Sequence, residues 1–393
     1  MATLGIKAYR FSISWPRIDP NGDGQWNAAG LDYYRRVTDC CLLHGIQPYV
    51  TLYHWDLPYT LECAGGWGSR STAYAFARYC GFVAAHFAGK IRHYITLNEI
   101  QCIVSLGYGS GIYAPGQRLS PADLFRCHHN LLLAHGLAFR AIRTVDPNAC
   151  IGIASTGRLC YPSSPPHQNL AAARAATFAT SDEDWMFTHQ MVLDPICLGR
   201  YPNCPGTTLQ PLIDAIPRDD MSIIHTDVHF LGFNIYNGTA VCADTSGDPV
   251  FLPKTIGCPR TALKWPITPD VMEFGPLFLW ERYQKSILIT ENGLSCNDFI
   301  YLDGAVHDLD RIDFLTRYLL ALQRVIGAGV PIIGYFHWAF TDNFEWNRGY
   351  SERFGLVYVD FNTQDRTCKD SALWYRSVIQ SNGGSLSTVT KSP

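Results

Sequence analysis

Seven short apolar runs recur along the chain, and their β-branched and aromatic residues are typical of buried strands. They span residues 6–15, 47–55, 93–99, 150–155, 228–236, 286–291 and 331–338. Longer stretches whose apolar residues follow helical spacing lie between many of these runs. These stretches span residues 27–45, 71–88, 120–143, 308–327 and 369–380. The alternation predicts a chain built from repeated strand–helix units.

Repeated strand–helix units favour a parallel sheet, and this many units favour a closed (β/α)8 barrel over an open sheet. We expect Ser71 to cap one helix, and Ser120, which precedes a proline, to open another. Residues 156–227 and 240–270 lack long helical patterns and predict loops and short helices at the barrel rim. The 393 residues, 47% of them apolar, can bury one large core. We therefore expect a single barrel domain over residues 1–393.

Composition excludes several classes of partner. The formal net charge is only −3, which gives no reason to expect a nucleic-acid partner. The 14 cysteines show neither metal-site nor disulfide-scaffold spacing, so we expect reduced thiols. No signal peptide is visible. No membrane span is visible either, because glycine, proline and histidine interrupt the most apolar window, residues 325–340. We expect a cytoplasmic protein without membrane contact. The oligomeric state stays open, a homo-oligomer included.

Two of the predicted strands end on a glutamate. The third run ends Asn98-Glu99, and the sixth runs into Glu291, after which Asn292-Gly293 turns the backbone away. Parallel barrels place their chemistry at the carboxyl ends of the strands. Two carboxylates at equivalent strand ends are what double-displacement hydrolysis of a glycosidic bond requires, with the carboxyl groups about 5–5.5 Å apart.

The chain resembles glycoside hydrolase family 1, the β-glucosidase and β-galactosidase family, from about residue 3 to about residue 383. Six segments in the family's order carry the resemblance. They are Tyr9 to Arg17 (YRFSISWPR), Leu52 to Pro58 (LYHWDLP), Thr96 to Glu99 (TLNE), Gly232 to Tyr236 (GFNIY), Ile289 to Gly293 (ITENG) and Gly334 to Gly355, which holds GYFHW, DNFEW and RFG. Any one segment is weak, but six in order are highly specific.

The resemblance implies a retaining mechanism without a cofactor. Glu291 would attack the anomeric carbon, and Glu99 would protonate the leaving oxygen and later deprotonate water. Arg10 matches the family's arginine beside the nucleophile, and the hydroxyl of Tyr236 would touch the nucleophile carboxylate. Without the motifs, Arg10 would more often be a structural ion pair and Tyr236 a packed ring.

The same resemblance assigns the sugar contacts. The matching positions are His54, Trp55, Asn98, Asn234, Trp265, Trp338, Glu345, Trp346 and Phe354. Asn98 would hold the 2-hydroxyl, Trp338 would stack on the sugar face, and Glu345 with Trp346 would bind the 4- and 6-hydroxyls. A carboxylate at Glu345 repels a 6-phosphosugar, so glucosides, galactosides or fucosides are the expected small-molecule substrates. Trp265 matches the aglycone-side tryptophan, with a plain loop anchor as the alternative.

Other constellations do not predict a cofactor. His128, His129 and His135 fall in one predicted helix without a His-Glu-x-x-His motif, so we expect no metal. The glycines at 107, 109 and 111 lack the strand-to-helix setting of a dinucleotide site.

Three departures from the family pattern stand out. Family members carry a first strand, with a sugar-binding glutamine, and a first helix before the Tyr9–Arg17 segment, and here both are expected to be missing. Ile100 replaces the usual proline after the acid. Ala339-Phe340-Thr341 replaces the common sequence after the stacking tryptophan, and we expect it to lie away from the sugar contacts. The main hypothesis is a retaining exo-β-glycosidase. The alternative is a catalytically impaired relative that keeps the fold and at most binds a sugar or a protein partner.

Overall fold

The structure is a computed structural model that describes residues 1–164 and 167–386. The chain divides into two compact units, which we name after the two glutamates. The Glu99 unit comprises Ala8–Arg158 and Phe178–Phe233. The Glu291 unit comprises Met1–Lys7, Leu159–Thr177 and Asn234–Pro393.

Parallel strands form the centre of the Glu99 unit. Their order is β1 (Ala8–Ser12), β2 (Gln47–Tyr53), β3 (His93–Asn98), β4 (Cys150–Ser155) and β6 (Phe230–Asn234), of which the last residue, Asn234, is counted with the Glu291 unit. The register pairs Phe11 with Val50 and Val50 with Tyr94. Side chains on these strands, including Val50, Ile95 and Phe233, are fully buried. Burial of this apolar surface is the main stabilising contribution.

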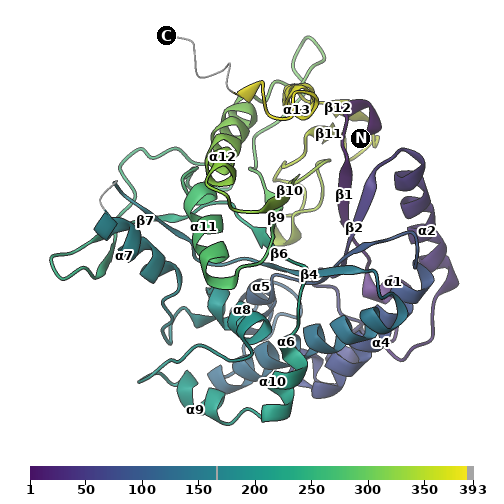
Figure 1. Cartoon of the computed structure of the whole chain (residues 1–393). Coiled ribbons are helices and arrows are strands. Elements are labelled where there is room, and N and C mark those ends of the chain that lie inside the picture. Colours follow the sequence, from purple (N-terminus) through teal and green to yellow (C-terminus); the bar gives the residue numbers. More distant parts are fainter. Residues whose placement is uncertain (165–166, 387–393) are drawn as a thin grey trace. The chain divides into compact units, whose positions relative to one another are not determined.

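Helices of the Glu99 unit follow most of its strands. They are α1 (Trp15–Ile18), α2 (Ala28–Leu43), α3 (Tyr59–Cys63), α4 (Arg70–His86), α5 (Ile100–Cys102), α6 (Pro121–Val145), α8 (His189–Leu198), α9 (Leu209–Asp214) and α10 (Arg218–Ile224), with the 3-10 turns η2 (Gly66–Gly68) and η4 (Trp185–Phe187) and the π-helix η3 (Ile103–Gly109). The long helices α4 and α6 lie side by side (Figure 1). Ser120 caps α6 as expected, because its hydroxyl accepts from the Asp123 amide at 3.3 Å. The expected cap at Ser71 is wrong. The extended residue before α4 is Ser69, and Ser71 already lies in the helix.

The Glu291 unit contains two further parallel strands, β9 (Ile287–Asn292) and β10 (Ile332–His337), paired with Ile289 opposite Tyr335. Its helices are α7 (His167–Thr177), α11 (Val271–Tyr283), α12 (Leu309–Gly327) and α13 (Asp370–Gln380), with turns η1 (Ala2–Leu4) and η5 (Trp346–Arg348). Helices α11 and α12 are neighbours (Figure 1). A two-stranded sheet joins β11 (Val357–Val359) to β12 (Arg366–Cys368).

The seven predicted strands are all present. The spans that we expected to hold only loops and short helices also contain strands. A three-stranded sheet forms from β5 (Cys160–Pro162), β7 (Thr239–Ala243) and β8 (Pro249–Phe251). The prediction missed it because β5 and β8 are three residues long, too short for a two-residue period to show. Among the described residues, no helix combines the length and apolar character that crossing a bilayer requires.

Candidate active site

Glu291 lies near the end of β9, a strand whose six residues are all buried. Its side chain is only 4% exposed. The hydroxyl of Tyr236 donates to Glu291 Oε2 at 2.7 Å, and the Ile235 amide donates to the Glu291 carbonyl at 2.9 Å. Backbone and side chain of Glu291 are therefore both fixed by the segment that follows β6. The contact expected between Tyr236 and this carboxylate is present.

Neighbouring residues hold the strand end that carries Glu291. Thr290 Oγ1 donates to Asn234 Oδ1 at 2.6 Å. Asn292 Nδ2 donates to the Ile235 carbonyl at 2.7 Å, and the hydroxyl of Tyr335 donates to Asn292 Oδ1 at 2.7 Å. Asn234 thus accepts a hydrogen bond from the residue that precedes Glu291 on its strand. Tyr335 was not predicted, because its closeness to Asn292 depends on the shifted β9–β10 register.

The carboxyl group of Glu345 is influenced by the charge of Glu291. Burial, and to a lesser extent the nearby Glu291 carboxylate, raises the pKa of Glu345 to about 7, whereas a hydrogen bond from Trp338 opposes this rise. Within the described part of the chain, no hydrogen-bond partner reaches Glu345 Oε2, although this atom is buried. A buried acceptor of this kind is suited to a ligand hydroxyl. Trp346 follows at the start of η5.

Three aromatic rings lie together, and one of them is Tyr236, which contacts Glu291. The Trp265 ring centroid lies 5.1 Å from that of Tyr236 in an edge-on arrangement, and Phe354 lies 6.3 Å from Trp265. Ala339, expected to lie away from the sugar contacts, instead donates its amide to the Phe354 carbonyl at 3.1 Å. That expectation is wrong, because the backbone after Trp338 pairs with the backbone after Arg353.

In the Glu99 unit, Glu99 follows β3 directly and is 7% exposed. Its backbone is left-handed, with φ 51° and ψ 66°. The Glu99 amide donates to the Ala154 carbonyl at 2.8 Å, and the Ile103 amide donates to the Glu99 carbonyl at 3.1 Å. Ile100, in place of the family's proline, is fully buried. The sharp turn of the backbone at Glu99 ends the strand and begins the next helix.

Asn98 is the centre of a polar group beside Glu99. Arg10 Nη2 donates to Asn98 Oδ1 at 2.6 Å, and Arg10 Nε donates to Thr51 Oγ1 at 3.1 Å. Because a guanidinium only donates, the oxygen of Asn98 must face Arg10 and its amide nitrogen must face His54 Nε2, 3.2 Å away. Trp55 Nε1 donates to the Asn98 carbonyl at 2.9 Å. Thr51 was not predicted, because nothing in its strand distinguishes it.

His54 is neutral in this setting. Burial, together with a smaller contribution from the charge of Arg10, lowers its pKa to about 3. Since Nε2 accepts from Asn98, the proton lies on Nδ1. A neutral imidazole with one donor and one acceptor suits recognition of a sugar hydroxyl.

The Glu99 unit also contains a pocket of ≈ 370 Å³ beside Trp55. Its lining includes the aromatic residues Trp55, Tyr108 and Tyr113 and the acidic residue Glu62. The Trp55 and Tyr113 centroids are 5.4 Å apart. One tryptophan thus borders both the pocket and Asn98.

The structure therefore groups the predicted residues within each unit. Arg10, His54, Trp55, Asn98 and Glu99 lie together in the Glu99 unit. Asn234, Tyr236, Trp265, Glu291, Trp338, Glu345, Trp346 and Phe354 all belong to the Glu291 unit. The placement of Arg10 beside Glu291 stays a prediction.

The described residues contain no group of three or more His, Cys, Asp or Glu side chains able to hold a metal ion. The three helical histidines instead make hydrogen bonds: His128 to the Met191 carbonyl, His129 to Tyr201 and Asp220, and His135 to Thr96 and Thr226. They stabilise the packing of α6.

Comparison with known proteins confirms the resemblance. The family described as "Glycosyl hydrolase family 1" matches residues 1–384. Beta-glucosidase A of Thermotoga maritima is 39% identical, with 97% of this chain and 84% of the relative covered. A bifunctional beta-D-glucosidase/beta-D-fucosidase of Bifidobacterium breve is 39% identical, with 96% and 84% covered.

Solved structures agree. The Thermotoga maritima beta-glucosidase in complex with glucoimidazole superposes with a TM-score of 0.86 at 39% identity, covering 97% of this chain and 85% of that one. The predicted TIM-barrel fold class is confirmed, and the protein is an O-glycosyl hydrolase. The chain belongs to glycosyl hydrolase family 1.

Proposed function

We propose that this protein hydrolyses unphosphorylated β-glucosides from the non-reducing end with retention of configuration, using Glu291 as nucleophile and Glu99 as acid/base. The observation that carries the proposal is the buried Glu291 carboxylate with the Tyr236 hydroxyl 2.7 Å from its Oε2. A fixed donor orients the carboxylate for its attack on the anomeric carbon.

The reaction has two balanced steps. In the first, Glu291 forms a bond to the anomeric carbon while the aglycone oxygen leaves with the proton of Glu99. In the second, water gives a proton to Glu99 and its oxygen bonds to the anomeric carbon, which releases Glu291. Burial of both glutamates supports these roles, because a water-poor site strengthens the electrostatic interactions that distinguish the transition state.

Substrate recognition follows from the fixed polar groups. Asn98, oriented by Arg10 and His54, contacts the 2-hydroxyl, where a hydrogen bond strengthens in the transition state. Glu345 Oε2 accepts from a hydroxyl at the 4- or 6-position. The carboxylate of Glu291, joined by that of Glu345 above its pKa of about 7, repels a phosphate at that end of the sugar. Fucosides are secondary substrates, which the name of the Bifidobacterium breve relative supports, and galactosides are a further candidate that hydrolysis assays would test.

Hydrolysis of an aryl β-glucoside tests the proposal. We expect turnover of the β-anomer, none of the α-anomer, and a first product whose anomeric proton signal is that of β-glucose. Glu291→Gln should abolish turnover, whereas exposed Glu183→Gln should not. A first product with the α-configuration would contradict retention. Absence of turnover by the folded protein would favour the impaired relative.

A further inference from the structure

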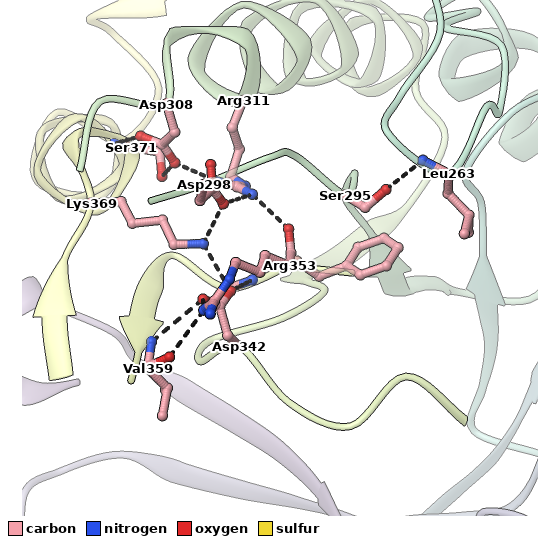
Figure 2. Close-up of polar contacts among 12 residues, drawn as sticks. Leu263, Ser295, Asp298, Asp308, Arg311, Asp342, Arg353, Val359, Lys369 and Ser371 are labelled. Atoms are coloured by element: carbon pink, nitrogen blue, oxygen red, sulfur yellow. Dashed lines mark hydrogen bonds and ion pairs between the residues drawn. The ribbon is translucent and has the colours of Figure 1, made fainter. Parts of the chain in front are cut away.

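A buried ionic cluster lies in the Glu291 unit (Figure 2). Its members are Asp298, Asp308, Arg311, Asp342, Arg353 and Lys369. Three carboxylates face three cations, so the charges balance. The side chains of Arg311, Asp342 and Lys369 have no exposed surface. Buried ion pairs of this kind often contribute little net stability compared with apolar packing, because the cost of desolvation offsets their attraction.

Lys369 joins two carboxylates that are otherwise separately paired. Its Nζ lies 2.6 Å from Asp298 Oδ2 and 2.8 Å from Asp342 Oδ1. Asp298 also pairs with Arg311 at 2.7 Å, and Asp342 pairs with Arg353 at 2.6 Å. Without Lys369, each of these two carboxylates would keep a cation, but the ammonium that bridges them would be lost.

Asp342 holds the segment that follows β10. Its carboxylate accepts from the Gly355 amide at 2.9 Å and the Val359 amide at 3.4 Å, while its own amide donates to the Val357 carbonyl at 3.0 Å. A Cβ at Gly355 would lie 2.2 Å from the Asp342 nitrogen, so the two backbones are in close contact. The segment from 338 to 359 carries four of the proposed sugar contacts: Trp338, Glu345, Trp346 and Phe354.

Asp298 lies on the chain that leaves Glu291. The Cys296 amide on this stretch donates to the Arg353 carbonyl at 3.1 Å, and Arg311 Nη2 donates to the same carbonyl at 2.9 Å. The cluster therefore joins the chain after the nucleophile to the segment that carries Glu345.

We propose that Lys369 is a positioning residue: by bridging Asp298 and Asp342 it fixes Glu345 and Trp346 relative to Glu291, and so sets the affinity for the hydroxymethyl end of the sugar. The inference rests on the proposed function. Lys369 does not touch the substrate. Its backbone amide, which donates to the Leu356 carbonyl at 3.0 Å, anchors it to the same segment.

The test is Lys369→Met, which keeps most of the length of the side chain and removes the ammonium group with its charge. Binding of deoxynojirimycin and of its analogue that lacks the hydroxymethyl group is measured by titration calorimetry. We expect the variant to bind deoxynojirimycin about tenfold more weakly, the loss of roughly one well-placed hydrogen bond, and the analogue less than about threefold more weakly. A structural defect alone would weaken both compounds by the same factor.

The matched control is Lys254→Met at an exposed position, which should leave both affinities unchanged. Equal weakening of both compounds by Lys369→Met, or no weakening, would overturn the inference. If that variant does not fold, Asp298→Asn removes the other end of the bridge and must give the same selective loss. If the unaltered protein binds both compounds but hydrolyses no aryl β-glucoside, the proposed function fails while the affinity ratio still decides the role of Lys369. If it binds neither, both fail.

Discussion

The hydroxyl of Tyr236 donates a hydrogen bond to Glu291, the proposed nucleophile. Tyr236→Phe removes the donor that lies 2.7 Å from Glu291 Oε2 without changing the ring packing against Trp265. We expect kcat for an aryl β-glucoside to fall about 10²-fold, with little change in KM, because the lost contact orients the reacting carboxylate. Steady-state kinetics checks this. Tyr301→Phe, at an exposed position, is the control, and an unaltered kcat in Tyr236→Phe would contradict the assigned role.

Glu345 makes stability depend on pH. Burial raises its pKa from 4.5 to about 7, so between these values the folded protein binds a proton that the unfolded chain has lost. The free energy of unfolding must therefore fall as pH rises through this window. Glu345→Gln removes this dependence. Its free energy of unfolding, relative to that of the unaltered protein, should therefore rise by on the order of 2 kcal/mol from about pH 5 to about pH 8.

Urea unfolding at the two pH values measures that gain. Glu183→Gln, on an exposed side chain, should show none. If the stability difference between Glu345→Gln and the unaltered protein stays constant with pH, the carboxyl group is not held in the buried state described.

Two helices of the Glu99 unit approach each other at a glycine. A Cβ at Gly136 in α6 would lie 2.1 Å from the carbonyl oxygen of Ile223 in α10. Gly136→Ala must displace backbone and should destabilise the protein by about 3 kcal/mol. Gly81→Ala in α4 is the matched control, since no atom that its Cβ would meet lies closer than the Ala141 Cβ at 3.4 Å, an ordinary contact distance, and alanine favours a helix by up to about 1 kcal/mol. Thermal unfolding that gives both variants equal stability would contradict the close approach.

An exposed histidine connects a loop to the start of α13. His307 lies 2.6 Å from Asp370 and 2.9 Å from Asp303, and these hydrogen bonds raise its pKa above 6.5. A raised histidine pKa stabilises the folded state below the unfolded value, and this contribution is lost as pH rises through the folded value. His307→Gln should therefore lower the melting temperature at about pH 6 and have little effect at about pH 9. Differential scanning fluorimetry measures the two melting temperatures at each pH. An equal decrease in melting temperature at both pH values would contradict the ion pairs of His307.

Over the whole molecule, the sequence pattern predicted the positions of the strands better than it predicted the contacts between elements. The runs ending at Glu99 and Glu291 are both strands, because a local apolar run followed by a turn suffices to define them. The β5–β7–β8 sheet could not be predicted, because its short strands show no clear sequence pattern and are defined only by their pairing with one another. Likewise, the Tyr335 bond to Asn292 and the Lys369 bridge join residues far apart in sequence. Motifs predicted the site residues, and the structure shows the hydrogen-bond partners of several of them, such as Tyr236 with Glu291.

The central claim is that Glu291 attacks the sugar. Its most direct test is reaction of the protein with a 2-deoxy-2-fluoro-β-glucoside that carries a good leaving group, followed by proteolysis and mass spectrometry. We expect one covalently bound sugar on the peptide that contains Glu291, and no label in Glu291→Gln. A label on another residue, or an unlabelled protein that still hydrolyses aryl β-glucosides, would contradict it.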